Sequence, residues 1–482
     1  MPTDSNSGGA GRRSRSRRPL AVDLFAGAGG LSLGLEQAGF DIVAAAEYDP
    51  VHAATHEFNF PHTEVLCADI SKLSAEKLRE AARKGIEAHG GDPEEWDGKL
   101  DLIAGGPPCQ GFSLIGKRLV DDKRNQLVFH FFRLVSELKP RYFVMENVPG
   151  MARGGHASIL DELILEFEEA GYRFPRDRKS KRKYRILNAA DFGVPQERHR
   201  LFLIGTRKGQ RLAKPPKPTV RPVPKRAVEV SEDEKTSPNG PTVWDAIGDL
   251  PNLNRFATLL ASDETGLSDS TVAAIDEVAS PYARRLRGLE DDAGDRSHPR
   301  AWNPAKLTSS MRTEHTAKSV RRFKSTKPGE TESISRYYRL DPGGLCNTLR
   351  AGSGSERGAF TSPRPLHPTL HRVLSNREAA RLHSFPDWFR LHATKWHGFR
   401  QVGNAVAPLV GRAVGKEIVA ALKLDPEIPE GTLALGKPAL LRLGMAEAVI
   451  HFGADKAAVP QPRTRGAIPA GVASPAPQPI AA

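Results

Sequence analysis

The stretch Asp23-Leu24-Phe25-Ala26-Gly27-Ala28-Gly29-Gly30 decides the fold of this 482-residue chain. The apolar run 21–27 predicts a buried strand, and the residues after Gly30 place Leu31, Leu35 and Ala38 on one face of a helix. A strand that passes through glycines into a helix makes a tight turn, where a ligand can approach the backbone closely. The stretch therefore predicts the first strand, turn and helix of a ligand-binding α/β fold.

Two further strands are predicted next, over 41–47 and 64–70, and each brings an acid to its end. Glu47 follows Gly27 by twenty residues, where a nucleotide-binding sheet holds ribose hydroxyls, and Asp69 could meet an adenine amino group. The glycine spacing is not GxGxxG, so an adenosyl ligand without pyrophosphate, such as S-adenosylmethionine, fits better than a dinucleotide. A glycine-rich turn without a ligand is the alternative.

A fourth strand, predicted over 100–106, leads into Gly105-Gly106-Pro107-Pro108-Cys109-Gln110-Gly111-Phe112-Ser113. The two prolines restrict the loop and would hold the Cys109 thiol at the carboxyl end of the sheet, where open α/β folds bind ligands. A single cysteine is more often a small buried apolar residue than a nucleophile. Cys109 becomes a candidate nucleophile because of the residues predicted to lie near it.

Glu146 is the first of these neighbours. A helix predicted over 125–138 leads into a strand over 141–147, which ends in Glu146-Asn147. The length between Cys109 and Glu146 suits one right-handed strand–helix–strand crossover, which would bring thiol and carboxyl to the same edge of the sheet. A purely structural hydrogen-bond acceptor is the alternative role for Glu146.

Arg198 and Arg200 are the second set of neighbours, in Gln196-Glu197-Arg198-His199-Arg200 before the apolar strand 200–206. Side chains at i and i+2 of a strand point to the same side, so both could face the cleft and lower the pKa of the thiol. A solvated charge run is the alternative.

The alternation of strands and helices predicts a doubly wound, mostly parallel sheet with a smaller, loop-rich inserted domain. The predicted divisions are a disordered basic arm (1–18), the first part of a catalytic domain (19–250), an inserted target-recognition domain (251–366), the returning part of the catalytic domain (367–424), and a C-terminal extension, mostly disordered (425–482). Helices are expected at 375–382 and 408–422 in the returning part.

Composition sets limits on the class of protein. The net charge of +13 permits a polyanionic partner without showing one. The three cysteines, Cys67, Cys109 and Cys346, form no CxxC pair, which argues against a disulfide framework or a structural zinc site and favours a reducing compartment. Neither a secretory signal nor a transmembrane run is recognisable, so we expect a cytoplasmic protein that uses no membrane and no metal.

Together these segments resemble the DNA cytosine-5 methyltransferase family. DLFAGAGGLSLGL, GGPPCQGFS, ENV and QERHR occur in the family's order, followed by SNREAARLHSFPDWF and QVGNAVAPLV near residues 375–410. The resemblance implies Cys109 as the nucleophile, Glu146 as the partner of cytosine N3, Arg200 as a base contact and Arg198 in a supporting role. It assigns the methyl donor, S-adenosylmethionine, to Phe25, Gly27, Gly29, Gly30, Glu47, Asp69 and the Gly403-Asn404 turn. Ala407 departs from the family, which often has proline there.

The resemblance also implies a reaction and its partners. A thiolate adds to cytosine C6, C5 takes the methyl group, and the base is first flipped out of double-stranded DNA. We expect a monomeric prokaryotic modification enzyme, nucleoid-associated, with a cognate restriction endonuclease encoded nearby. The alternatives are a transfer-RNA methyltransferase of the same fold and a catalytically silent DNA-binding relative.

Overall fold

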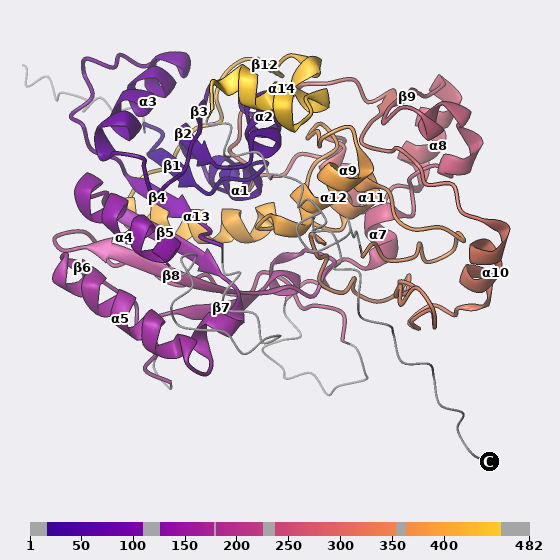
Figure 1. Ribbon diagram of the computed structural model, residues 1–482, viewed down its shortest axis with the longest axis horizontal. Coiled ribbons are helices and arrows are strands. Elements are labelled where there is room, and N and C mark those ends of the chain that lie inside the picture. The colour runs from indigo at the N-terminus through magenta and orange to yellow at the C-terminus, as the bar shows by residue number, and fades with distance from the viewer. Residues whose placement is uncertain (1–16, 109–125, 178–179, 225–236, 353–362, 455–482) are drawn as a thin grey trace, which may run out of the picture.

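A mixed eight-stranded sheet organises the larger lobe of the computed structural model, which describes residues 17–108, 126–177, 180–224, 237–352 and 363–454 (Figure 1). The strand order is β3-β2-β1-β4-β5-β8-β6, and β7 pairs with β8. Strands β1 to β5 are parallel to their neighbours, whereas β8 runs antiparallel to β5. The expected doubly wound, mostly parallel sheet is therefore confirmed. Its order reverses beside β1, and that is where such sheets bind ligands at their carboxyl edge.

The strands of this sheet are β1 (Leu20–Leu24), β2 (Asp41–Glu47), β3 (Glu64–Cys67), β4 (Leu102–Gly105), β5 (Tyr142–Asn147), β6 (Tyr172–Arg173), β7 (Arg185–Asn188) and β8 (His199–Arg207). Its helices are α1 (Gly30–Gln37), α2 (Pro50–Asn59), α3 (Ala75–Ala88), α4 (Gln126–Leu138), α5 (His156–Glu169) and α13 (Pro408–Leu422). The predicted strands are all present, several of them shorter than expected because the last residues of each apolar run turn out of the sheet.

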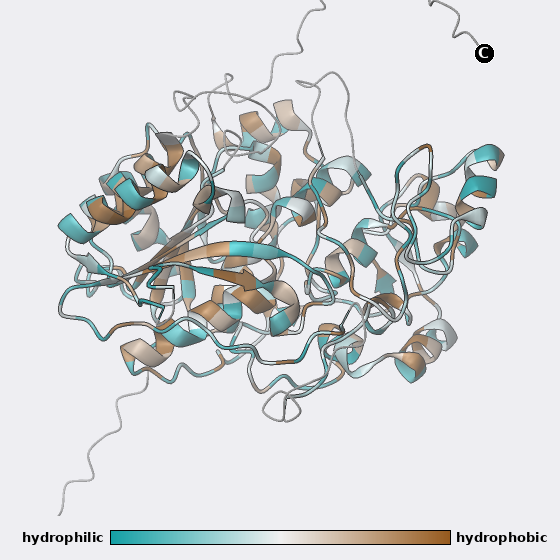
Figure 2. Cartoon of the chain, turned by 90° about the horizontal axis from the view of Figure 1, so that it is seen from below, coloured by the Kyte–Doolittle hydropathy of each residue, from teal (hydrophilic) through white to brown (hydrophobic). Residues whose placement is uncertain are grey.

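Two apolar cores cover the two faces of the sheet. One face packs against α3, α4 and α5 through residues such as Leu78, Phe131 and Phe167. The other packs against α1 and α13, which bury Leu35 and Val414 against it. Figure 2 shows hydrophobic residues on the central strands and on the helix faces that turn toward them. Because α13 belongs to the returning part of the chain, the sheet is covered only when the chain comes back to it.

The second lobe is loop-rich, with short helices and two-residue strands (Figure 1). Its elements are α7 (Val243–Ile247), β9 (Thr265–Gly266), α8 (Asp269–Val278), α9 (Pro281–Leu286), β10 (Arg300–Ala301), β11 (Lys306–Leu307), α10 (Ala317–Ser325), α11 (Asn376–Arg381) and α12 (Lys395–Asn404). Residues of α7 and α9 share a core with residues 374–402, so this lobe mixes the inserted and returning parts of the chain. The expected helix at 375–382 is confirmed as α11.

Both chain ends differ from our expectation. Arg17 and Arg18, which we placed in the disordered arm, form ion pairs with Asp101 and Asp41, while residues 1–16 lie outside the described residues. Of the extension expected to be mostly disordered, residues 425–454 are ordered: they contain β12 (Leu433–Ala434), which pairs with β10, and α14 (Met445–Phe452), which packs on α2. Apolar contacts such as Leu440 and Leu441 against Phe58 explain this order. In the described ranges, no helix has the length and apolar character needed to cross a bilayer.

Candidate active site

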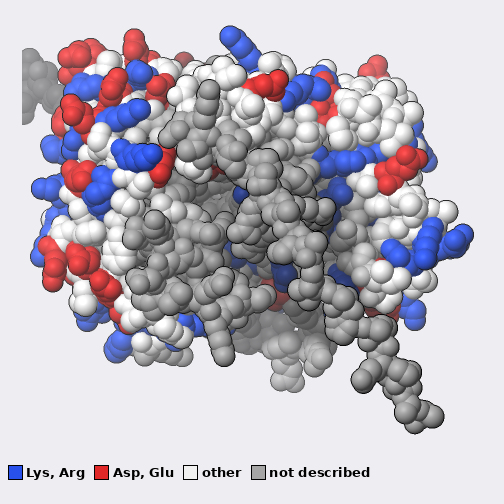
Figure 3. Space-filling model, in the orientation of Figure 1, with Lys and Arg blue, Asp and Glu red and all other residues white. Residues whose placement is uncertain are grey.

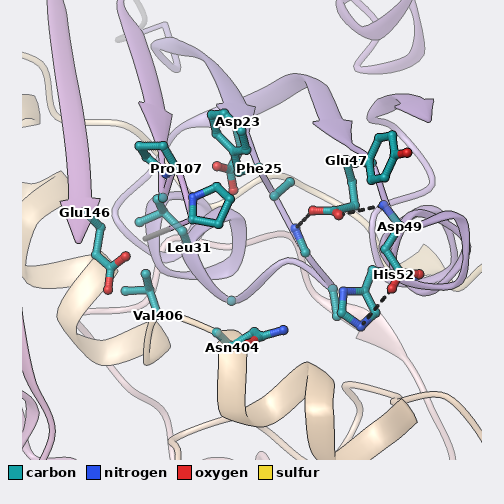
Figure 4. A pocket seen from close by; sticks show the side chains of 18 of the residues that line it. Asp23, Phe25, Leu31, Glu47, Asp49, His52, Pro107, Glu146, Asn404 and Val406 are labelled. Carbon is teal, nitrogen blue, oxygen red and sulfur yellow. Dashed lines mark hydrogen bonds and ion pairs between the residues drawn. The ribbon is translucent and has the colours of Figure 1, made fainter. Parts of the chain in front are cut away.

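A cavity of about 1090 Å³ opens at the carboxyl edge of the sheet, between β1, β2, β4 and β5 on one side and α12 on the other. Its wall includes nine of the candidate residues, namely Phe25, Gly27, Gly30, Glu47, Asp69, Glu146, Arg198, Arg200 and Asn404. Figure 4 shows Glu47 and Glu146 at opposite ends of this space, with Pro107 between them. The structure thus brings residues from four distant parts of the chain around one cavity.

The turn after β1 has an unusual backbone. Phe25 has a φ of 61°, a conformation that non-glycine residues rarely adopt and that often marks a functional position. Glu47, at the end of β2, fixes the turn because its Oε2 accepts a 2.8 Å hydrogen bond from the Gly27 backbone nitrogen. Its Oε1 accepts from the Asp49 nitrogen, also at 2.8 Å. Glu47 therefore both shapes the loop and presents carboxylate lone pairs to the cavity.

The predicted glycines have different roles. Gly30 lies at the cavity wall, where an added Cβ would come within 2.5 Å of the Val406 carbonyl oxygen. Gly29 is not part of the wall; its φ is 102°, and an added Cβ would come within 2.2 Å of the Phe60 ring. Gly29 thus allows the turn to pack against Phe60, and its expected ligand contact stays a prediction.

Asp69 and Asn404 border the end of the cavity that contains Glu47, called the donor end below. Asp69 lies two residues beyond β3, and its Oδ1 accepts hydrogen bonds from Ser71 N and Ser71 Oγ at 2.9 and 2.7 Å. Asn404 ends α12, is exposed, and borders the cavity opposite the β1 turn (Figure 4). Ala407 precedes α13 with a φ of −63°, which is the value proline would impose, so this backbone would accept either residue.

Glu146 and Arg200 form the polar group at the other end of the cavity. Arg200 Nε lies 2.9 Å from Glu146 Oε1, and both side chains are largely buried. Burial raises the pKa of Glu146 above the ordinary carboxyl value, and the positive charges of Arg200 and Arg198 oppose this rise only in part. A carboxyl group in this setting can retain a proton nearer to neutral pH than a solvated one.

The Arg198 side chain contacts backbone carbonyl groups, whereas Arg200 contacts Glu146. Its guanidinium is 3% exposed and donates to the carbonyl oxygens of Leu349, Gly403 and Ala405 at 3.0, 2.8 and 2.9 Å. These bonds join the end of the inserted part of the chain to the Gly403-Asn404 turn. The two arginines therefore do not act as a pair: Arg200 contacts the carboxyl group of Glu146, whereas Arg198 fixes the backbone around the cavity.

Cys109 lies outside the described residues, but the segment that leads to it is described. Strands β4 and β5 are adjacent and parallel, so the loop after Gly105 starts beside the end of β5, as the crossover argument predicted. An added Cβ on Gly106 would lie 3.0 Å from Glu146 Oε2, and Asn147 Nδ2 donates to the Pro107 carbonyl at 3.3 Å. The polypeptide thus enters the Cys109 loop in contact with Glu146 and its neighbour.

Sequence reasoning missed several residues of the wall, including Asp23, Asp49, His52, Arg400 and Met445. Asp49 has a local signal, because it precedes Pro50 and caps α2 by accepting from Val51 N. Met445 has none, since it reaches the cavity only through the packing of α14 on α2. Cys346, by contrast, is fully buried away from the cavity wall.

The fold and this cavity define an α/β enzyme class with a ligand site at the carboxyl edge of the sheet, beside a buried carboxyl group. The comparisons with known proteins go further. Residues 21–420 match the family model described as C-5 cytosine-specific DNA methylase. The chain is 48% identical over 442 residues to Type II methyltransferase M.XorII of Xanthomonas oryzae pv. oryzae, which covers 92% of this chain and 94% of that protein. It is 32% identical to Type II methyltransferase M1.HphI of Haemophilus parahaemolyticus, over 83% of this chain and 86% of that protein.

A solved structure gives the same result for the fold. An E. coli protein assigned as a prophage-encoded DNA modification methyltransferase superposes with a TM-score of 0.61 at 31% identity, covering 84% of this chain and 99% of its own. The chain belongs to the C-5 cytosine-specific DNA methylase family. It is a DNA cytosine-5 methyltransferase, and S-adenosylmethionine is the methyl donor of this class. The resemblance drawn from the sequence is confirmed.

Proposed function

We propose that this enzyme transfers the methyl group of S-adenosylmethionine to C5 of a flipped-out cytosine through a covalent bond between Cys109 and C6. The observation that carries the proposal is the single cavity, with an acid and a glycine turn for the donor at one end and Glu146 with Arg200 at the other. For direct methyl transfer, the methyl donor and the target base must occupy the same cavity. The residues of the cavity wall suit both.

At the donor end, the residues present suit an adenosyl ligand. Phe25 offers an aromatic ring, Glu47 offers carboxylate oxygens for ribose hydroxyls, and Asp69 offers an acceptor for an amino group. Asn404 closes the opposite side. The donor supplies an activated methyl group, while these side chains bind and orient it.

At the base end, Glu146 would hold a proton at cytosine N3, which makes C6 more electrophilic toward the Cys109 thiolate. Its raised pKa favours the protonated form that this role needs. Arg200, at 2.9 Å, would orient the carboxyl group and contact the base. Addition of the thiolate moves electron density to C5, which takes the methyl group; loss of the C5 proton and departure of the thiolate then restore the ring. Arg198 would hold the backbone on both sides of the cavity in place.

The second lobe would bind the DNA around the flipped base. Figure 3 shows Lys and Arg side chains on the surface of the second lobe, at the right of the view. In the inserted part of the chain, Arg321, Lys324, Arg336 and Arg350 are exposed, so their side chains can reach phosphates. Arg339 is not, because it is 4% exposed and donates to the carbonyl oxygens of Phe323 and Pro368. Phosphate contacts would offset the few kcal/mol needed to flip a base.

The relatives' names indicate a biological setting. Both M.XorII and M1.HphI are called type II methyltransferases, so we propose a modification enzyme of that type, monomeric, cytoplasmic and nucleoid-associated, with a cognate restriction endonuclease. We place the target-recognition function in residues 251–366, flanked by the catalytic segments 19–250 and 367–424.

The covalent step is tested by trapping. Wild-type enzyme with duplex DNA containing 5-fluorocytosine and S-adenosylmethionine should form a complex that survives denaturing electrophoresis, because the fluorine blocks elimination. Cys109→Ser should form none and transfer no methyl group, while retaining donor binding by calorimetry. Normal turnover of Cys109→Ser would refute the mechanism. Transfer RNA, offered in parallel as methyl acceptor, should not be methylated.

A further inference from the structure

Asp23 is a buried carboxyl group for which the proposed mechanism has no use. It lies on β1 two residues before Phe25, is 1% exposed, and borders the donor end of the cavity (Figure 4). Its Oδ2 accepts a 2.6 Å hydrogen bond from Ser32 Oγ, which also lies 3.0 Å from His56 Nε2. Its Oδ1 is buried and has no hydrogen-bond partner.

No cation neutralises Asp23 within the described part of the chain. Ser32 faces it from α1 and His56 from α2, and burial lowers the pKa of His56 to about 3, so that ring is neutral. Glu47 acts on it from β2 with a charge of the same sign. The residues paired with Asp23 on β2 and β4 are alanines.

The more distant charges act on other groups. Arg400, which borders the cavity from α12, acts on Asp49, and His52 lies 3.9 Å from the same carboxylate. Glu36, further along α1, forms a 2.8 Å ion pair with Arg300. On the other side of the cavity, Arg200 is paired with Glu146, and Arg198 donates to three carbonyl oxygens. Burial raises the pKa of Asp23 to about 7, against the hydrogen bond from Ser32. A buried carboxylate with no cation is unfavourable, so this site either holds a proton or awaits a positive charge.

Glu47 provides a useful contrast within the same cavity. Each of its oxygens accepts a hydrogen bond from a backbone nitrogen, of Gly27 and of Asp49, and such bonds favour the charged form. Asp23 has one neutral hydroxyl donor on one oxygen and none on the other. Burial raises the pKa of both acids, but for Glu47 the two backbone hydrogen bonds and the charge of His52 oppose the rise. The charge of Asp23 therefore depends more strongly on what fills the cavity.

We propose that Asp23 is the counter-charge of the sulfonium group of the methyl donor: it is protonated in the empty site, releases its proton to solvent when the cationic donor binds, and takes a proton back once the sulfur is a neutral thioether. The inference rests on the proposed donor site. Its consequence is selectivity, because the site favours the methylated donor over S-adenosylhomocysteine, the product that would otherwise inhibit the next turnover.

Calorimetry can test the linkage, since the two ligands share the adenosine, ammonium and carboxylate groups and differ at the sulfur. Binding to the full-length protein is measured between pH 6 and 8 in buffers of different ionisation enthalpy. Below the pKa of Asp23, the affinity for S-adenosylmethionine should rise by up to about tenfold per pH unit, with release of a proton. The affinity for S-adenosylhomocysteine should change far less.

Asp23→Asn is the informative variant, because asparagine mimics the protonated acid and can still accept from Ser32. It should lose the pH dependence of donor binding and bind the donor more weakly at pH 8, while its affinity for the product stays close to wild type. Asp101→Asn is the matched control: Asp101, directly before β4, is equally buried, but it is paired with Arg17 and Arg141 and does not border the cavity. Asp101→Asn should keep the wild-type dependence of donor affinity on pH.

Equal proton release for both ligands, or an unchanged slope in Asp23→Asn, would overturn the inference. If the variant fails to fold, the comparison of the two ligands on the wild-type protein still decides it. Absence of binding by either ligand would refute the proposed donor site itself, which is a distinguishable result.

Discussion

Replacing Arg198 with methionine should damage this enzyme differently from replacing Arg200, although the two residues are only two positions apart. Arg198 donates to the carbonyl oxygens of Leu349, Gly403 and Ala405, so the substitution removes three bonds from a charged donor at a buried site. Methionine keeps much of the volume and leaves the carbonyls without that donor. Arg200→Met instead removes the ion pair with Glu146 at the cavity.

The size of the effect follows from these bonds. A buried polar group left unsatisfied costs about 1 kcal/mol at the lower end of its range. The Ala405 carbonyl also accepts from His383 Nε2 at 3.0 Å, so the other two carbonyls give a loss of roughly 2 kcal/mol. With about 2.1 cal/mol/K of unfolding entropy per residue, a chain of 482 residues loses roughly 1 °C per kcal/mol, so the midpoint of thermal unfolding should fall by about 2 °C. Because Gly403 precedes Asn404, donor affinity should fall as well. For Arg200→Met, Glu146 can hold a proton in place of the ion pair, because burial already raises its pKa, so the loss of stability should be smaller than for Arg198→Met.

Thermal unfolding and donor calorimetry on both variants, with methyl transfer to duplex DNA, separate the two roles. Arg198→Met should lose stability and donor affinity, whereas Arg200→Met should melt near wild type and lose mainly turnover. If Arg198→Met melts within about 0.5 °C of wild type and binds the donor normally, the argument from its hydrogen bonds is refuted.

Three other predictions concern the acids and the second lobe. Glu146→Gln should lower the rate of methyl transfer by about 10²–10⁴-fold with donor binding retained, and an unchanged rate in single-turnover assays would contradict its role. The ligand-free protein should lose up to about 4 kcal/mol of stability between pH 4 and 7, because the pKa of Asp23 is raised on folding and its contribution is lost as pH rises through about 7. In urea unfolding, the free energy of unfolding of Asp23→Asn should depend less on pH than that of wild type. An equal dependence in the two proteins would contradict this prediction. Replacing Arg321 and Lys324 together with alanine should weaken binding to any DNA sequence and reduce the slope of log affinity against log salt by about 2, whereas a loss confined to one sequence would indicate base contacts.

Local sequence predicted much of the fold because short apolar runs and glycine turns specify strands and their ends. The carboxyl edge that carries Phe25, Glu47 and Glu146 followed from the order of parallel strands, since each strand ends at the same edge. The adjacency of β4 and β5 followed from the length of one crossover.

The remaining features depend on contacts between distant residues, which one sequence does not display. Arg198 looked like half of an arginine pair, yet its partners lie 151 to 207 positions further along the chain. The order of residues 425–454 comes from packing on α2, so their composition alone suggested disorder. Asp23 was quoted as part of a motif, but only the structure shows that no cation accompanies it.

The packing of α13 on α1 has a consequence for how this protein is made. Leu31 and Leu35 are buried by residues of α13, and the cavity wall extends from Asp23 to Met445, so the methyl-transfer site is complete only when almost all of the described chain has been synthesised. Translation at 5–20 residues per second leaves the apolar face of α1 uncovered for about 20–80 s on each nascent chain, during roughly 380 residues of elongation. During synthesis, then, chaperone binding has time to compete with aggregation at this face, and a ribosome that stalls before α13 releases no active enzyme.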